Sequence, residues 1–184
     1  MVREFLRAEL GSPRFSDRYR RVLDDRGWDA SRLFASDSEA ARQRSELLGA
    51  VRGYRRDTWL FRGFPDGVRW TRDVCSAVHL DRLYYGRFPE WMTLSGGSRR
   101  VRDGAQAMAG HRAEPALAAR VAETLADLRR GLPTPALIAL AAAPDRWVLL
   151  EGHTRATALA CMHAPPALPL ILGHSADFSG WAYV

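Results

Sequence analysis

The segment Arg146-Trp-Val-Leu-Leu-Glu-Gly-His-Thr-Arg-Ala-Thr-Ala-Leu159 sets the expected fold of the second half of this chain. Its apolar run predicts a strand that ends at Glu151, and Gly152 permits a sharp turn directly after it. Thr154 then begins a helix that continues to about Met162. The segment therefore predicts a strand, a tight turn and a helix in direct succession.

This turn has the composition of an anion-binding site. The first backbone N–H groups of a helix have no partner inside the helix and carry partial positive charge. A glycine before them lets a phosphate approach closely. His153, Thr154 and Arg155 add an imidazole, a hydroxyl and a guanidinium at the same place. The alternative is an ordinary turn in which Thr154 caps the helix and His153 is half-exposed, and the residues alone favour neither interpretation.

Helices and strands alternate along the rest of the second half. We expect strands at 68–74, Trp91–Leu94, 136–141 and 168–172, and a helix that has Pro115 in its first turn and ends at Gly131. The sequence Ser95-Gly96-Gly97-Ser98 is expected to form a turn. This alternation predicts an α+β fold with a small mixed sheet flanked by helices.

Residues 1 to about 60 are expected to be mostly helical. A capping box, Ser36 with Glu39, opens one helix that places its apolar residues on a single stripe. A proline and two glycines between Gly63 and Gly67 interrupt the pattern. We therefore predict a helical N-terminal extension over 1–62 and a core over 63–184.

The composition fits a globular protein of 184 residues, with 47% hydrophobic and 26% charged residues. The net charge is +6 and every basic residue is arginine, but the arginines are spread in short pairs, so charge alone argues only weakly for nucleic acid. Cys75 and Cys161 have no metal-ligand spacing, and no metal site is expected. There is no apolar run of membrane-spanning length and no signal peptide, so we expect a cytoplasmic protein without membrane contact.

Three segments carry a resemblance to a known superfamily. They are Gly131-Leu-Pro-Thr-Pro135, the strand that comes after it, and Leu150-Glu-Gly-His-Thr-Arg155. Together they resemble the nucleotide-binding core of the ParB N-terminal domain and sulfiredoxin superfamily. More narrowly, Trp91-Met-Thr-Leu-Ser-Gly-Gly-Ser-Arg99 and the ending at Ile171–Ser175 with Trp181 are similar to small stand-alone ParB-like proteins of unassigned function. The resemblance covers about residues 68 to 184.

The resemblance implies a small sheet that binds ATP, ADP or CTP. Sulfiredoxins carry their catalytic cysteine directly after the turn glycine, where this chain has His153, so sulfinic acid reduction is not expected. The free serine kinases of the superfamily have a Gly-His-His-Arg-like turn and transfer phosphate from a nucleotide. They are the nearest of the well-understood relatives, although Thr154 replaces their second histidine.

Roles for individual residues come from the turn chemistry and this resemblance together. Gly152, Thr154 and Arg155 are expected to hold nucleotide phosphates. His153 is expected to contact the transferred phosphoryl group or to transfer a proton, since its unperturbed pKa lies near neutrality. Glu151 is expected to orient the acceptor or to help hold Mg²⁺. We also expect His174, in the last strand, to approach the turn.

A second set of donors is expected from the loop before the long helix. Its residues are Ser95, Gly96, Gly97, Ser98 and Arg99, and Arg99 is the strongest candidate among them for binding phosphate. A plain connecting turn is an equally weighted alternative.

The sequence therefore predicts a nucleotide-binding protein, with ATP or another nucleotide bound with or without Mg²⁺. A nucleotide-dependent phosphotransferase or nucleotide hydrolase acting on a small-molecule acceptor is the first hypothesis. A nucleic-acid-binding or nuclease module is the second, because superfamily members carry both activities and the chain is basic. A non-catalytic nucleotide sensor is the third, and a homodimer formed through the N-terminal helices is left open.

Overall fold

The computed structural model of the chain describes all 184 residues and divides them into two compact units. The first unit comprises Met1–Asp66 and Ser179–Ala182, and the second comprises Gly67–Phe178 and Tyr183–Val184. No helix in either unit is both long enough and apolar enough to cross a membrane.

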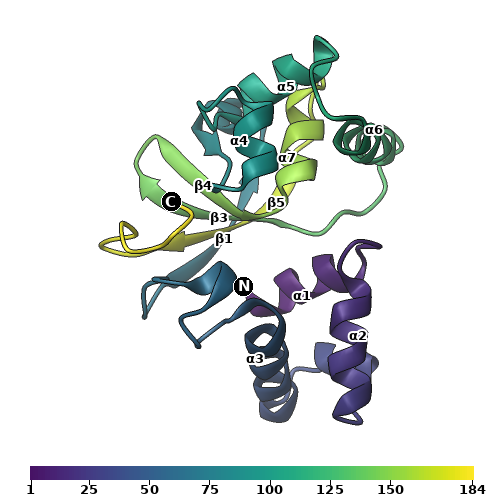
Figure 1. Cartoon of the computed structure of the whole chain (residues 1–184), viewed down its shortest axis with the longest axis vertical. Coiled ribbons are helices and arrows are strands. Elements are labelled where there is room, and N and C mark those ends of the chain that lie inside the picture. Colours follow the sequence, from purple (N-terminus) through teal and green to yellow (C-terminus); the bar gives the residue numbers. More distant parts are fainter. The chain divides into compact units, whose positions relative to one another are not determined.

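The first unit is helical. Its elements in chain order are α1 (Val2–Leu10), α2 (Ser16–Asp25), the 3-10 helix η1 (Ala30–Phe34), α3 (Ser38–Arg52) and the 3-10 helix η2 (Trp59–Phe61) (Figure 1). The expected helix after residue 36 is present, but Asp37 rather than Ser36 caps it, with its carboxylate accepting from the amide of Ala40 at 2.7 Å.

A buried carboxylate holds the helices of this unit together. Glu9 of α1 accepts hydrogen bonds from the Tyr19 hydroxyl at 3.0 Å and from Arg52 Nε at 2.9 Å. Burial and the adjacent Glu9 carboxylate raise the pKa of Tyr19. At the end of the chain, Trp181 Nε1 donates to the carbonyl of Leu60 at 2.7 Å, which ties the segment Ser179–Ala182 to this unit.

The second unit contains the sheet and the remaining helices. Its elements in chain order are β1 (Arg69–Cys75), the 3-10 helix η3 (Ala77–Arg82), β2 (Leu83–Tyr84), α4 (Pro89–Leu94), α5 (Val101–Ala109), α6 (Pro115–Arg129), β3 (Leu137–Ala143), β4 (Arg146–Glu151), α7 (His153–Ala160) and β5 (Leu168–His174). The expected helix at Pro115 is therefore present, and so are the three strands and the one helix expected after it.

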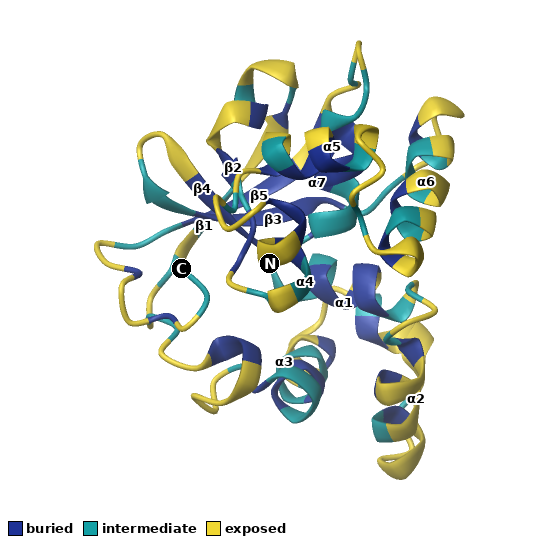
Figure 2. Ribbon diagram, turned by 45° about the horizontal axis from the view of Figure 1, so that its top comes forward, coloured by how far each residue is buried: buried dark blue, intermediate teal, exposed yellow.

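The five strands form one mixed sheet in the order β1-β5-β3-β4-β2. β1 pairs with β5, and β3 pairs with β4, in antiparallel fashion, while β3 with β5 and β2 with β4 are parallel pairs. The central strand β3 is buried over residues 137–140, and Figure 2 shows the neighbouring strands largely buried as well. The predicted α+β class, with helices flanking a small mixed sheet, is confirmed.

The helix α7 lies at the centre of the helical layer. In Figure 1, α4, α5, α6 and α7 lie on one side of the sheet, and α7 contacts α5, α6 and β3. Ala156, Ala158 and Leu159 of α7 are fully buried in the core. The small alanines allow close packing, and this packing fixes the direction of the turn that precedes the helix.

The expected strand at Trp91–Leu94 is wrong, because this segment belongs to the helix α4. Pro89 occupies the first turn, where its fixed φ and missing N–H suit a helix start. Trp91 and Leu94, three residues apart, are buried while Met92 and Thr93 are exposed, which is a helical pattern of burial. The helix α5 and the two-residue strand β2 were not predicted from the sequence.

Candidate functional site: the Gly152 turn and the loop beside it

The Gly152 turn directly follows β4, which pairs with the parallel strand β2. β2 runs parallel to β4, with Leu83 opposite Trp147 and Tyr84 opposite Val148. Tyr85 and Gly86, directly after β2, therefore run beside the last residues of β4, and a Cβ at Gly86 would lie 3.1 Å from the Leu149 carbonyl oxygen. In open sheets the crevice outside the carboxyl ends of strands is a common position for ligands.

Gly152 must be glycine for two independent reasons. Its φ is 96°, in the left-handed region that side chains disfavour. A Cβ at this position would also lie 2.7 Å from Leu137 Cδ2, inside the buried sheet. The strand-to-helix turn predicted from the sequence is therefore tight, and its geometry is fixed by the packing against β3.

The first amides of α7 have no acceptor within the protein. The first intrahelical bond is donated by Ala156 to the Gly152 carbonyl at 2.8 Å, and no side chain caps the helix. The amides of His153, Thr154 and Arg155 make no hydrogen bond within the protein, and neither does the Thr154 hydroxyl. Thr154 is thus no cap, and the turn presents donors without acceptors.

Arg155 is engaged with Glu151, one helical turn before it. The guanidinium pairs with the Glu151 carboxylate, and its Nη2 also donates to the Ala136 carbonyl at 3.2 Å. The two side chains are only 14% and 18% exposed, and Arg155 Nε is buried without a partner. Glu151 therefore neutralises much of the charge of Arg155 and holds the guanidinium beside the turn.

His153 is enclosed by aromatic rings. Its ring stacks on Tyr85 and Trp91, with centroids 6.1 Å and 5.5 Å away, and meets Phe88 edge-on at 5.0 Å. Its Nε2 accepts the amide of Gly86 at 3.3 Å. Burial, and secondarily the charge of Arg155, lowers the pKa of His153 to about 3. His153 therefore does not keep the near-neutral pKa of an unperturbed histidine, and the imidazole is uncharged at physiological pH.

The loop at Ser95–Arg99 uses its donors internally. The amides of Gly96 and Gly97 donate to the Thr93 and Met92 carbonyls. Buried Ser95 accepts the amide of Arg99 at 3.0 Å with its hydroxyl oxygen. The remaining amide in the loop, that of Ser98, donates to the Ser95 carbonyl, so no backbone donor is left for a phosphate.

Arg99 itself holds two chain segments together. Its φ is 64°, its Nε donates to the Tyr85 carbonyl at 3.0 Å, and its Nη2 donates to the Tyr183 carbonyl at 3.2 Å. Burial, together with the nearby charges of Arg87 and Arg146, lowers the pKa of Arg99. These contacts give Arg99 a structural role that its sequence context does not predict.

The two predicted donor sets share one neighbour, the Tyr85–Gly86 segment. Arg99 binds the Tyr85 carbonyl from one side, while His153 stacks on the Tyr85 ring and accepts the Gly86 amide. Neither Gly86 nor Phe88 was predicted as a site residue. The Tyr84-Tyr85-Gly86 run carries a signal for Gly86, because a glycine directly after two aromatic residues indicates close approach of another chain segment.

His174 does not approach the turn. β5 runs parallel to β3 and therefore antiparallel to β4. The carboxyl end of β5 thus lies at the end of the sheet where β4 starts, at the opposite end of the strands from Gly152. There His174 Nε2 lies 3.1 Å from the Thr71 hydroxyl. The chain contains no cluster of three or more His, Cys, Asp or Glu side chains with the geometry of a metal site.

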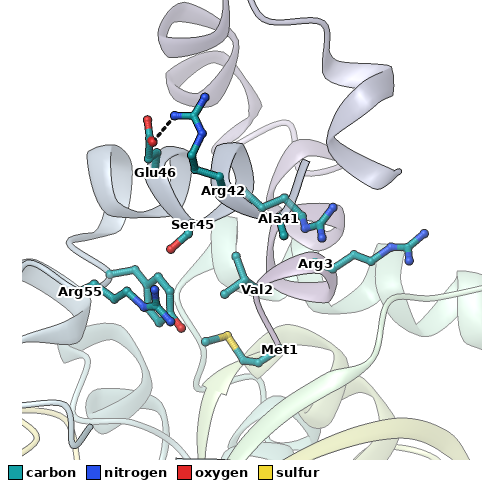
Figure 3. Close-up of a pocket in the computed structure, with 10 residues that line it drawn as sticks. Met1, Val2, Arg3, Ala41, Arg42, Ser45, Glu46 and Arg55 are labelled. Carbon is teal, nitrogen blue, oxygen red and sulfur yellow. Dashed lines mark hydrogen bonds and ion pairs between the residues drawn. The ribbon is translucent and has the colours of Figure 1, made fainter. Parts of the chain in front are cut away.

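The helical unit has a hollow of its own. A cavity of about 660 Å³ opens between α1, α3 and the segment after α3 (Figure 3). Most of its charged lining residues already have partners, as Figure 3 shows for the Arg42–Glu46 ion pair. None of the residues predicted to bind a nucleotide lines it.

No protein-family model, no curated protein and no solved structure matches this chain. The resemblance to the ParB and sulfiredoxin superfamily is therefore still a prediction, and the function has to be inferred from the geometry of the turn.

Proposed function

We propose that the turn from Gly152 to Arg155 binds the phosphate groups of a nucleotide. The observation that carries the proposal is the set of three consecutive amides, at His153, Thr154 and Arg155, without acceptors in the protein. Amides at a helix N-terminus combine directed donors with the positive end of the helix dipole, which suits phosphate oxygens.

The side chains around the amides support the same ligand class. The unpartnered Thr154 hydroxyl adds a neutral donor. Arg155 adds a guanidinium that Glu151 already orients, and a phosphate that approaches the turn shares this charge. The turn would position a bound phosphoryl group and stabilise its negative charge. These are the main contributions that phosphoryl transfer requires from a protein. On this basis the bound nucleotide is the donor in a phosphotransfer or hydrolysis reaction.

Calorimetric titration with ATP, ADP, CTP and pyrophosphate, each with and without Mg²⁺, tests the binding step. We expect wild type to bind at least one of the four, and Arg155→Gln to bind it about 10- to 100-fold more weakly, because charge-assisted bonds are lost. Arg130→Gln is the matched control, since it breaks an exposed ion pair with Asp127 on α6. Equal affinity in wild type and Arg155→Gln would show that the site is elsewhere.

Two further measurements separate this function from its rivals. Release of ADP or inorganic phosphate from bound ATP identifies an enzyme, whereas stabilisation by nucleotide without turnover identifies a sensor. Binding of DNA or RNA that weakens steeply with added salt, and is insensitive to Arg155→Gln, would instead favour a nucleic-acid-binding module.

A further inference from the structure

The lone pair of the His153 ring is already in use. Neutral imidazole has one protonated nitrogen, which donates, and one unprotonated nitrogen, which accepts. His153 Nε2 lies 3.3 Å from the amide nitrogen of Gly86, and this amide can only donate. The hydrogen bond therefore fixes the proton of the neutral ring on Nδ1.

The surroundings of the ring favour this neutral form. Tyr85, Phe88 and Trp91 surround the imidazole, and the charged group acting on it is Arg155, which is itself a cation. Tyr85 is fully buried, and its hydroxyl lies 2.7 Å from the Thr157 hydroxyl, which in turn donates to the His153 carbonyl at 2.8 Å. The ring is thus held between α7 and the segment after β2, so it cannot turn freely.

The Nδ1 atom is free for a ligand. It makes no hydrogen bond within the protein, and it is not among the buried unpartnered atoms of the chain. It belongs to the first residue of α7, directly beside the unpaired amides of the helix N-terminus.

We infer that His153 is a neutral donor to the bound phosphate through Nδ1–H, and is neither a general base nor a phosphoryl acceptor. The identity of the ligand as a phosphate rests on the proposed function. The donor role of His153 rests on the hydrogen bond from the Gly86 amide. A ring whose lone pair accepts a backbone amide cannot take a proton or a phosphoryl group without breaking that bond. If the protein catalyses transfer, the base must come from the acceptor, from water or from another residue.

Nuclear magnetic resonance of ligand-free protein with ¹⁵N-labelled histidine tests the tautomer without any ligand. We expect the long-range ¹H–¹⁵N correlation pattern of His153 to show a protonated Nδ1 and an unprotonated Nε2 at neutral pH. A protonated Nε2, or a doubly protonated ring at about pH 6, would overturn the inference.

Two substitutions test the donor role. His153→Phe fills the aromatic enclosure without a donor, and should weaken binding of pyrophosphate or ATP about tenfold. His153→Asn places an amide N–H₂ close to the Nδ1 position, and should stay within about threefold of wild type. Thermal melting of each variant checks that it folds, and if His153→Phe does not fold, the comparison of His153→Asn with His153→Ala replaces it.

The outcomes distinguish the inference from the proposed function. Wild type that binds none of the four phosphate ligands contradicts both the function and the donor role. Wild type that binds, together with equally tight binding by His153→Phe, contradicts the donor role alone. A loss of binding in both His153→Phe and His153→Asn also contradicts it, because the packing of the ring would then matter and the donor would not.

Discussion

Two glycine turns of the second unit have the same kind of sequence and different physical properties. The turns at Gly96-Gly97 and at Gly152 both have glycines at positive φ, both precede an arginine, and the sequence predicts phosphate contacts for both. In the first turn every amide has an acceptor within five residues, and in the second three consecutive amides have none.

The difference lies in the segment after each turn. After Gly97 the chain continues as a loop, in which the Ser95 hydroxyl and nearby carbonyls fold back onto the amides. After Gly152 a helix begins at once, and a helix cannot satisfy its own first amides. In this chain, therefore, a glycine turn leaves backbone amides unpaired where a helix starts directly after it and no side chain caps that helix.

The largest expected effect comes from adding a side chain at Gly152. Gly152→Ala combines left-handed strain with a Cβ placed against Leu137, so we expect about 2–4 kcal/mol of destabilisation and loss of measurable phosphate binding. Gly97→Ala is the matched control, because its φ is 86° but a Cβ there meets nothing within 4 Å. It should cost about 1–2 kcal/mol and leave binding intact. Urea unfolding and calorimetric titration measure the two effects, and equal effects of both substitutions would remove the distinction.

A second comparison sets the two arginines against each other. Arg99→Gln removes charge-assisted bonds to the Tyr85 and Tyr183 carbonyls, so we expect a loss of about 2 kcal/mol in stability with little change in phosphate affinity. Arg155→Gln should show the opposite pattern, with the larger effect on affinity. Unfolding in urea and calorimetric titration of both variants measure the two quantities. A loss of affinity in Arg99→Gln that exceeds its loss of stability would restore the loop as a binding element.

The smallest expected effect is a dependence of stability on pH. It comes from His153 in the Gly152 turn and has no counterpart in the loop at Ser95–Arg99. The pKa of His153 is about 3 in the folded chain and about 6.5 when unfolded, so below pH 6.5 the unfolded state binds one more proton. Stability should therefore fall as the pH falls from about 6.5 toward 3, by at most about 1.4 kcal/mol per pH unit from this group. Unfolding free energies of wild type and His153→Phe between about pH 7 and pH 5 isolate the contribution. Parallel curves for the two proteins would show that His153 is not buried as a neutral ring.

Local patterns predicted the elements that form the turn. The apolar stripe between Pro115 and Gly131 predicted α6, and the apolar run before Gly152 predicted β4 and α7 within two residues. These predictions succeed because a glycine, a proline or a run of apolar residues constrains its own neighbours directly. The prediction for Trp91–Leu94 failed because so short a run fits both periods, and the deciding residue, Pro89, lies outside it.

The order of residues along the chain was enough to specify a strand, a left-handed glycine and a helix in succession, and hence unpaired amides beyond Glu151. The state of the side chains around those amides depends on packing in three dimensions. The Gly86 amide and the enclosing aromatic rings keep the His153 ring neutral. The Glu151 carboxylate neutralises much of the charge of Arg155. Gly86 lies 67 residues from His153 in the chain, and burial and hydrogen bonding depend on proximity in space, which local sequence does not encode.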